Sequence, residues 1–277
     1  MFLHTYHPQP IILKIGVISI HWYGLLITVG IVLGLILVNR LAKNYNLKKD
    51  EIFDLAFYLV IFGLIGARLW SVLTETSGYY WQNPWAIFKI WQGGLAIHGA
   101  ITVGILVLFF YSRRKGNNLF LWLDLIVLAL ILGQAFGRWG NYFNQEIFGR
   151  PTNLLWGIPI NLENRPVGYE NFEYFHPTFL YESFWNFLIF IFLLILHLRQ
   201  IKKGIISDGK IFSFYLIFYG FGRFFLEFLR VDYQSIVLGL RFEQMVALVL
   251  FFVGWIILIY RLKVVKHNAG LFAKLNN

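Results

Sequence analysis

Three arginines in this sequence follow a small residue inside an apolar stretch, in the pairs Ala67–Arg68, Gly137–Arg138 and Gly222–Arg223. An arginine stays charged when it is buried, and its planar guanidinium can hold a phosphate through two hydrogen bonds. Ionisable residues in apolar segments are costly and usually functional. The pattern therefore predicts that these arginines bind a phosphate group.

Two more charged residues accompany the last of these arginines. Arg223, Glu227 and Arg230 are spaced i, i+4 and i+7, so they share one face of a helix. Glu227 can hold Arg223 in place and compensate its buried charge. For Arg230, nearer the surface, two interpretations stay open: a structural ion pair, or a part of the site.

His98 is the candidate for proton transfer. It lies in the run Gly93-Gly94-Leu95-Ala96-Ile97-His98-Gly99. Imidazole suits proton transfer near neutral pH, and glycines let a substrate approach the backbone closely. A single histidine is more often a hydrogen-bonded packing residue, but its occurrence with the arginines favours the catalytic interpretation. His176, which precedes Pro177, is expected to cap the following helix instead.

The sequence lacks the residues that several other kinds of functional site require. The sequence has no Cys, which excludes disulfides, thiolate metal sites and a cysteine nucleophile, so any reacting thiol must come from a partner. It has no HExxH pattern, no histidine pairs at i, i+4 and no GxxxxGK loop. We therefore expect neither a metal site nor a cofactor.

The composition indicates a membrane protein. Of the 277 residues, 58% are apolar and only 14% are charged, too few charges to cover a soluble domain of this size. The net charge of +10 could suggest nucleic-acid binding, but most of it lies in short connectors between apolar runs. We expect a single all-α membrane domain, residues 1–277, and no nucleic-acid partner.

Seven apolar segments approach the roughly 20 residues that a membrane-spanning helix needs. They are Val17–Val38, Ile52–Leu73, Leu95–Tyr111, Leu119–Phe136, Thr178–Leu198, Ile211–Leu229 and Ile236–Tyr260. The long connector of residues 137–177, rich in Pro and Gly, is expected to fold as a small extracytoplasmic cap. The amphipathic residues 1–16 are expected on the outer surface.

Basic residues mark alternate connectors. Arg40, Arg113, Lys202 and Arg261 belong to basic clusters that all fall on one side if there are seven spans, whereas the opposite connectors hold few lysines. Positive charge favours the cytoplasmic side. The N-terminus is therefore expected outside the cell and the C-terminus in the cytoplasm.

With this orientation, the candidate residues fall in the outer half of the membrane. At a rise of about 1.5 Å per residue, Arg68 and Arg223 lie roughly 24 Å and 18 Å from the inner starts of their segments. The outer ends of the other segments carry His21, Tyr23, His98, Arg138, Tyr181 and Glu182. In the inner half, Asp54 and Asp124 occupy first turns, where the helix dipole favours a carboxylate, and are interpreted as orienting their helices.

One stretch closely resembles a known family signature. Residues 137–150, GRWGNYFNQEIFGR, are similar to the signature of the bacterial prolipoprotein diacylglyceryl transferases. Five further patterns of that family occur in the same order: His21-Trp22-Tyr23-Gly24, Gly66-Ala67-Arg68-Leu69, the glycine-rich run ending at Gly99, His176-Pro177-Thr178-x-x-Tyr181-Glu182, and Gly222-Arg223-Phe224-x-x-Glu227-Phe228-x-Arg230-x-Asp232. Six patterns in order, over nearly the whole chain, make the resemblance specific.

The resemblance implies a reaction that the residues alone do not name. The family transfers a diacylglyceryl group from phosphatidylglycerol to the lipobox cysteine of a preprolipoprotein. This first step of lipoprotein maturation yields a thioether and glycerol phosphate. The expected partners are therefore phosphatidylglycerol and a lipobox signal peptide. The expected location is the bacterial cytoplasmic membrane, with the active site toward its outer leaflet.

The resemblance also suggests roles for individual residues. His98, Arg138, Arg223 and Tyr23 would be catalytic, and His98 would accept the thiol proton unless the arginines alone favour the thiolate. Phosphatidylglycerol would be bound by Arg138, Arg223, Asn141, Arg68 and His21, while Tyr23 helps to orient its headgroup. Supporting roles fall to Glu146, Glu227, Gly149, Tyr181, Glu182 and Arg230, with the two glutamates Glu146 and Glu227 positioning the arginines.

Three alternatives compete with this interpretation. A transporter or channel could also carry intramembrane charges, but no inverted repeat is evident and the charges lie to one side. A light-driven or ligand-sensing seven-helix receptor is the second alternative; a retinal Schiff base would need a lysine in the last segment, and Ile236–Tyr260 has none. A different lipid-headgroup transferase is the nearest alternative, which only analysis of the product would separate.

Overall fold

The computed structural model describes residues 2–16, 18–204 and 209–275, with side chains up to Lys263. The chain divides into two units, each described by itself: Met1–Val38 with Asp124–Asn277, and Asn39–Leu123. Nearly all regular structure is helical, and the strands that do form are short antiparallel pairs. The all-α prediction is therefore confirmed in outline.

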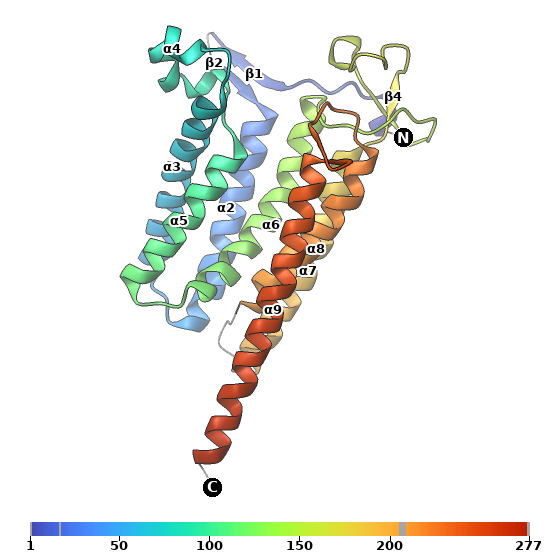
Figure 1. Cartoon of the computed structure of the whole chain (residues 1–277). Helices are drawn as coiled ribbons and strands as arrows, with labels where there is room; N and C mark the ends of the chain where they lie inside the picture. Colours follow the sequence, from blue (N-terminus) through green and yellow to red (C-terminus); the bar gives the residue numbers. More distant parts are fainter. Residues whose placement is uncertain (1, 17, 205–208, 276–277) are drawn as a thin grey trace. The chain divides into compact units, whose positions relative to one another are not determined.

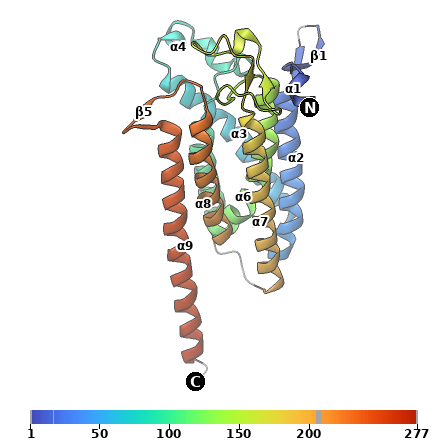
Figure 2. The ribbon, with the colours of Figure 1, turned by 90° about the vertical axis from the view of Figure 1, so that its right-hand side faces the viewer.

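The first unit is a bundle of long helices (Figure 1). It contains α2 (Trp22–Ala42) as far as Val38, α6 (Leu119–Phe143) from Asp124, α7 (Thr178–Lys202), α8 (Lys210–Leu226) with the 3₁₀ turn η5 (Glu227–Leu229), and α9 (Phe242–Leu275). Figure 2 shows α9 running beside α8.

Small residues let these helices approach closely. A Cβ added at Gly30 of α2 would lie 3.0 Å from the Cα of Gly133 on α6. One added at Gly220 of α8 would lie 2.6 Å from the carbonyl oxygen of Ala247 on α9. Without a hydrophobic force between helices in lipid, such close backbone contact is the main source of attraction.

Six helices are long and apolar enough to cross a membrane. They are Trp22–Tyr45, Lys49–Thr74, Leu119–Phe143, Thr178–Lys202, Lys210–Leu229 and Phe242–Lys263. Many of their apolar side chains are exposed, among them Phe184 and Phe187 of α7, as expected for contact with lipid. The predicted third segment also forms a helix, α5 (Ile97–Lys115), which is not among the six and carries three basic residues in its last turn.

Two predicted segments begin too early, because their first residues form hairpins. Residues Ile18–His21 form β2, which pairs with β1 (Ile11–Ile15), so α2 begins only at Trp22; the predicted start at Val17 lies outside the described residues. Likewise β5 (Ile236–Val237) and β6 (Leu240–Arg241) precede α9. Leu238 and Gly239 between them have positive φ angles of 50° and 78°, which a helix does not allow.

One predicted segment ends too early. Helix α6 continues to Phe143, two turns beyond the predicted end at Phe136. The connector to α7 is therefore residues 144–177 rather than 137–177. As a result, Arg138 and Asn141 lie on a helix instead of in a loop.

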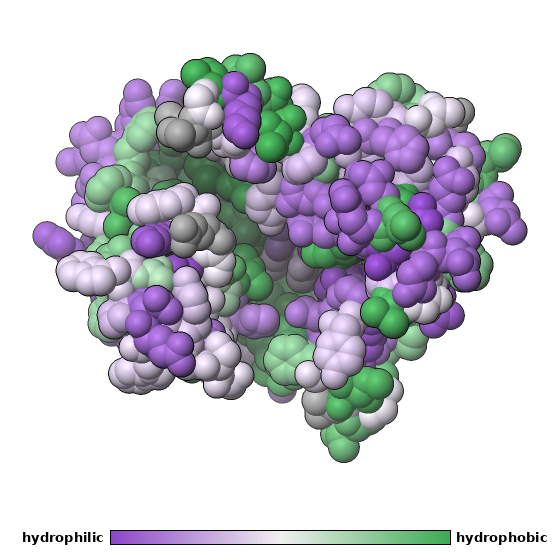
Figure 3. All heavy atoms as spheres, turned by 90° about the horizontal axis from the view of Figure 1, so that it is seen from above, coloured by the Kyte–Doolittle hydropathy of each residue, from purple (hydrophilic) through white to green (hydrophobic). Residues whose placement is uncertain are grey.

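The 144–177 connector has an apolar cluster of its own. Phe148, Ile158, Ile160 and Phe175 are buried against the ends of α6 and α7, where Tyr142 and Phe179 complete the cluster. Strands β3 (Ile158–Pro159) and β4 (Tyr174–Phe175) pair within it, and η4 (Leu162–Asn164) lies between them. Its outer surface is mainly hydrophilic, as the right-hand part of Figure 3 shows.

The N-terminal segment packs on this connector. Helix α1 (Phe2–Thr5) contacts β3, the His4 ring stacks on Tyr174 at 4.1 Å, and His4 Nδ1 lies 2.9 Å from the Gly157 carbonyl oxygen. Gln145 donates to the carbonyl oxygen of Pro8. Residues 2–8 therefore pack against the 144–177 connector.

The second unit is a helix pair with a folded connector. Helices α3 (Lys49–Thr74) and α5 pack where Gly66 meets Gly99, and a Cβ on Gly99 would overlap the Gly66 carbonyl oxygen. The connector contains α4 (Tyr79–Gln82) and the 3₁₀ turns η2 (Pro84–Phe88) and η3 (Ile90–Gln92); a third such turn, η1 (Lys43–Tyr45), precedes α3.

Asp124 interacts with a neighbouring helix as well as with the dipole of its own helix. Its two carboxylate oxygens accept hydrogen bonds from the backbone N–H groups of Gly209 and Phe212, each at 2.8 Å. These are N–H groups at the start of α8, which have no partner within the helix. Asp124 therefore caps a neighbouring helix, a role that its position in the sequence does not reveal.

Candidate functional site

One carboxylate joins the two arginines that the sequence singled out. Glu182, in the second turn of α7, lies 2.7 Å from Nε of Arg138 through Oε2 and 3.0 Å from Nη1 of Arg223 through Oε1. Arg138 comes from α6 and Arg223 from α8, so three helices meet at this point. Glu182 is 4% exposed, Arg223 9% and Arg138 20%.

A polar chain extends from Arg138 toward the connector. Its Nη1 donates to Oδ1 of Asn141 at 3.3 Å, and the Asn141 amide donates to Oε1 of Glu146 at 2.8 Å. Arg138 and Asn141 are three residues apart on α6, which brings them to one helix face. Glu146 therefore holds the buried Asn141, which in turn contacts Arg138.

The other side of Arg223 leads to a second carboxylate. Glu227, which is fully buried, lies 2.9 Å from Nη2 of Arg223, 3.4 Å from Nη1 of Arg230 and 3.1 Å from Nη1 of Arg241. The i, i+4 pairing of Arg223 with Glu227 agrees with the prediction. A fully buried carboxylate needs such compensation, because an unpaired buried charge costs several kcal/mol.

The residues after η5 complete the network. Both carboxylate oxygens of Asp232 accept from Arg230, at 2.8 and 3.0 Å. Burial would raise the pKa of Asp232, but its hydrogen bond to Arg230 and the Arg230 charge outweigh this and lower it. Arg241 donates to the carbonyl oxygens of Glu227, Arg230 and Asp232 and so fixes the course of the chain between η5 and β6.

Charges in this network are nearly balanced. Four arginines, Arg138, Arg223, Arg230 and Arg241, are paired with Glu182, Glu227, Asp232 and, at 3.8 Å from Arg223, Glu243. Nη2 of Arg138 and Nε of Arg223 make no hydrogen bond to another described residue. The two arginines are therefore held in place and keep N–H donors for a further anion.

Tyr23 lies against the same part of α6. Its ring covers Gly140, where any side chain beyond hydrogen would overlap it. Tyr23 is 37% exposed. His21, two residues earlier and the last residue of β2, is also exposed. The structure therefore brings Tyr23 next to the signature helix, while a contact of His21 with substrate stays a prediction.

Gly149 permits a close backbone contact that side chains would prevent. A Cβ there would lie 2.7 Å from Cβ of His176 and 3.1 Å from the Leu229 carbonyl oxygen. Gly149 N donates to the His176 carbonyl oxygen, and Arg150 N donates to that of Leu229. The glycine thus lets the connector cross both the start of α7 and the end of η5.

Tyr181 and His176 form a small cluster beside this crossing. The Tyr181 hydroxyl lies 3.2 Å from Nδ1 of His176 and accepts from Nε1 of Trp156 at 2.9 Å. Burial lowers the pKa of His176, which favours the neutral imidazole. The N-cap residue of α7 is Pro177, so the predicted capping role of His176 is wrong; its backbone N donates to the Arg150 carbonyl oxygen, and the residue supports the connector instead.

Arg68 and His98 belong to the second unit and are described within it. Arg68 is buried and donates to four backbone carbonyl oxygens, those of Ala86, Ile87, Gly93 and Gly94, at 2.5 to 2.9 Å. Its guanidinium also lies 5.2 Å from the Tyr80 ring centroid. Four of its five N–H donors are therefore committed to the connector between α3 and α5, and its predicted role in phosphate binding stays untested.

His98 is half-buried in the first turn of α5. Its ring centroid lies 6.2 Å from that of Trp70 on α3. The predicted meeting of Arg68 and His98 with the arginines of the first unit stays a prediction. Among the described residues, no group of three or more His, Asp and Glu side chains could hold a metal ion.

Sequence reasoning missed Arg241 as a site residue. Arg241 and Glu243 both lie within the predicted segment Ile236–Tyr260, so the rule that flagged Arg223 would have flagged them too. Both residues stand at the start of a long apolar run, which led to the whole segment being assigned to a spanning helix.

Comparison with known proteins identifies the family of this chain. The family model described as prolipoprotein diacylglyceryl transferase matches residues 10–260. This chain belongs to the prolipoprotein diacylglyceryl transferase family. The match covers every residue of the network described above.

Curated relatives of the family span nearly the whole chain. The phosphatidylglycerol–prolipoprotein diacylglyceryl transferase of Trichormus variabilis is 46% identical over 249 residues, 89% of this chain and 87% of its own. That of Prochlorococcus marinus subsp. pastoris is 40% identical over 282 residues, 94% of this chain and 95% of its own. The one from Acaryochloris marina is 46% identical over 243 residues, 87% and 86% of the two chains.

Proposed function

We propose that this protein transfers the diacylglyceryl group of phosphatidylglycerol to the lipobox cysteine of a preprolipoprotein. The observation that carries the proposal is the meeting of Arg138 and Arg223 at Glu182, in a chain that belongs to this transferase family. Two guanidinium groups held side by side form a site for one phosphodiester. The relatives' names supply the acceptor, a prolipoprotein.

The chemical step forms one bond and breaks another. The cysteine sulfur, as the thiolate, attacks the terminal glyceryl carbon of the diacylglyceryl group, and the bond from that carbon to the phosphate oxygen breaks. Its electron pair leaves with glycerol phosphate, so negative charge grows on the phosphate. Arg138 and Arg223 stabilise this charge through their unused N–H donors, which are already oriented and need no rearrangement.

The thiol proton needs an acceptor. We assign it to His98, whose imidazole can accept a proton near neutral pH, with Arg-assisted thiolate formation as the alternative. A His98→Ala variant that kept the wild-type transfer rate at every pH would remove this assignment. Asn141 and Tyr23 orient the headgroup, since Asn141 is fixed by Glu146 and the Tyr23 ring, which comes from α2, packs on Gly140 beside Asn141.

The membrane arrangement that suits this function has seven spans. The six long apolar helices indicate a multi-pass protein, bacterial by its relatives. We propose that α5 is the seventh span, despite its basic last turn, because an odd number leaves the basic connectors together on the cytoplasmic side. The N-terminus and the 144–177 connector then lie outside, where the connector caps an active site at the outer leaflet of the cytoplasmic membrane.

A direct transfer assay tests the function. Purified protein is mixed with phosphatidylglycerol vesicles and a lipobox peptide, and the peptide is analysed by mass spectrometry. The expected result is a mass gain of one diacylglyceryl unit on the cysteine, with release of glycerol phosphate. A peptide with Ser in place of the lipobox Cys should remain unmodified. An unchanged Cys peptide, in protein that is shown to be folded, would contradict the proposal.

A further inference from the structure

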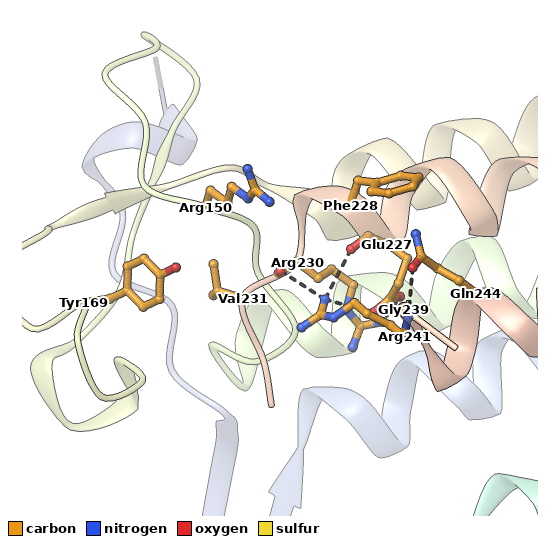
Figure 4. Close-up of a pocket in the computed structure, with 9 residues that line it drawn as sticks. All are labelled: Arg150, Tyr169, Glu227, Phe228, Arg230, Val231, Gly239, Arg241 and Gln244. Atoms are coloured by element: carbon orange, nitrogen blue, oxygen red, sulfur yellow. Dashed lines mark hydrogen bonds and ion pairs between the residues drawn. The ribbon is translucent and has the colours of Figure 1, made fainter. Parts of the chain in front are cut away.

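A further arginine, Arg150, lines a cavity together with Arg230 and Arg241 of the network, and no step described above uses this cavity. The cavity has a volume of about 490 Å³ and lies within the first unit, between the connector, η5 and the β5–β6 turn (Figure 4). Its charged lining consists of Arg150, Arg230, Arg241 and Glu227, and Tyr169 and Gln244 add polar groups.

Arg150 differs from the other two arginines. Arg230 is held by Asp232 and Glu227, and Arg241 by Glu227 and three carbonyl oxygens. The Arg150 guanidinium is exposed and has no ion-pair or hydrogen-bond partner among the described residues. Its backbone is fixed on both sides by Leu229 and His176, so the charge stays at the cavity without being neutralised. In Figure 4 the Arg150 guanidinium and the Tyr169 hydroxyl both point toward the side where Arg230 and Arg241 lie.

One carboxylate, that of Glu227, connects this cavity with the arginines of the proposed active site. Glu227 lines it and also lies 2.9 Å from Arg223. An anion that leaves Arg223 would therefore find the next guanidinium groups here. Six of the nine lining residues lie outside the six long apolar helices, and the other three, Glu227, Phe228 and Gln244, lie at the ends of two of them.

The chemistry of the lining favours a small soluble anion over a lipid. A groove on α7 and α8, lined by Leu180, Phe184, Phe221 and Phe225, is almost wholly apolar and would suit acyl chains. The arginine-lined cavity has only Phe228 and Val231 as apolar side chains. A phosphomonoester carries a charge between −1.5 and −2 at pH 7, more than the −1 of a phosphodiester, and so gains more from three guanidinium groups.

We propose that this cavity binds glycerol phosphate, the soluble phosphomonoester product, as it leaves the active site, with Arg150 as the residue that captures it. The inference rests on the proposed function, because that reaction supplies the ligand. Arg150 would act only after the carbon–oxygen bond has broken, so it contributes to product binding and not to lipid binding.

Equilibrium binding tests the site without any turnover. The full chain is placed in nanodiscs of phosphatidylcholine, and glycerol 1-phosphate is titrated by calorimetry, with uncharged glycerol as the ligand control. We expect Arg150→Ala to weaken binding about tenfold, the loss of one charge-assisted contact. Lys14→Ala, which removes an exposed charge from the β1–β2 hairpin, should bind like wild type. Equal binding by wild type and Arg150→Ala would overturn the proposal.

Kinetics separate the product from the lipid headgroup. In the transfer assay, Arg150→Ala should leave the KM for phosphatidylglycerol unchanged and reduce inhibition by added glycerol 1-phosphate. If the variant raised this KM by the same factor as it weakened binding, the cavity would belong to the lipid headgroup and the product assignment would be wrong. Binding that depends on Arg150 in a wild-type protein without transfer activity would instead support the site and contradict the proposed function.

Discussion

Glu182 accepts from two arginines on different helices, and it is the residue whose role the sequence described least well. The resemblance included it among supporting residues, and the helical spacing paired Arg223 with Glu227 correctly, because i, i+4 contacts follow from the sequence. Contacts between helices do not, since periodicity contains no information about which faces meet. The bridge between Arg138 and Arg223 therefore required the structure.

Removing the charge of Glu182 should misalign both arginines. In Glu182→Gln, an amide N–H₂ would face one guanidinium, so one charge-assisted interaction becomes unfavourable. We expect kcat/KM for phosphatidylglycerol to fall roughly 10- to 100-fold, the loss of about 1.5–3 kcal/mol. Glu182→Asp keeps the charge but is one methylene shorter, and should recover part of the loss.

Two comparisons make this result interpretable. Glu163→Gln removes an exposed carboxylate from η4 and should keep wild-type kinetics. Thermal unfolding of each variant separates misalignment from loss of the fold. A folded Glu182→Gln protein with unchanged kcat/KM would show that the bridge does not position the arginines.

At the scale of elements, the presence of each helix could be predicted from the sequence better than the residues at which it begins and ends. Segment Thr178–Leu198 began at the right residue, because Pro177 marks a helix start. Residues 18–21 and 236–241 were wrongly assigned to helices, since short runs of Ile, Val and Leu suit a strand equally well. The end of α6 was missed because Gly137 and Gly140 resemble a loop, although they continue the helix to Phe143.

Gly149 shows how one residue fixes the connector on the helices. In Gly149→Ala the new methyl group would lie 2.7 Å from Cβ of His176, 3.0 Å from Cγ2 of Thr178 and 3.1 Å from the Leu229 carbonyl oxygen, which leaves it little room. The connector must shift, and with it Glu146, the partner of Asn141. We expect a destabilisation of about 1–3 kcal/mol and a clear loss of transfer activity, measured by thermal unfolding and the transfer assay.

Gly137 offers the matched control. It lies on α6 in the same signature, but a Cβ there would meet nothing within 4 Å. Gly137→Ala should therefore be neutral or slightly stabilising, because alanine favours the helix. Equal effects of the two substitutions would mean that close packing at Gly149 is not what the structure requires.

At the scale of the molecule, two titratable groups outside the long helices respond to acid differently. Burial raises the pKa of Asp232, but its hydrogen bond to Arg230 and the Arg230 charge lower it overall, so this ion pair persists toward acid pH. Burial lowers the pKa of His176 and favours its neutral form. We therefore expect acid to affect His176 before it affects Asp232.

The sign of this effect follows from proton binding. The folded pKa of His176 lies below the unfolded value of about 6.5, so between them the unfolded chain binds more protons. This contribution to stability is complete above pH 6.5 and decreases as the pH falls below it. We expect His176→Gln to have a flatter thermal stability profile between pH 7 and 5 than wild type, with differential scanning fluorimetry as the measurement. Parallel profiles would exclude His176 as the source of the acid sensitivity.

The carbonyl oxygens gathered by Arg68 affect how variants at that position should be interpreted. The guanidinium holds the middle and the C-terminal end of a connector whose Trp81, Trp85 and Trp91 are 90%, 79% and 76% exposed. In Arg68→Ala, four peptide oxygens would lose their donors at once, and this aromatic segment would come loose from the helix pair. If the Arg68→Ala enzyme is inactive, the first explanation to test is therefore loss of the connector structure, and only then loss of a contact with the ligand.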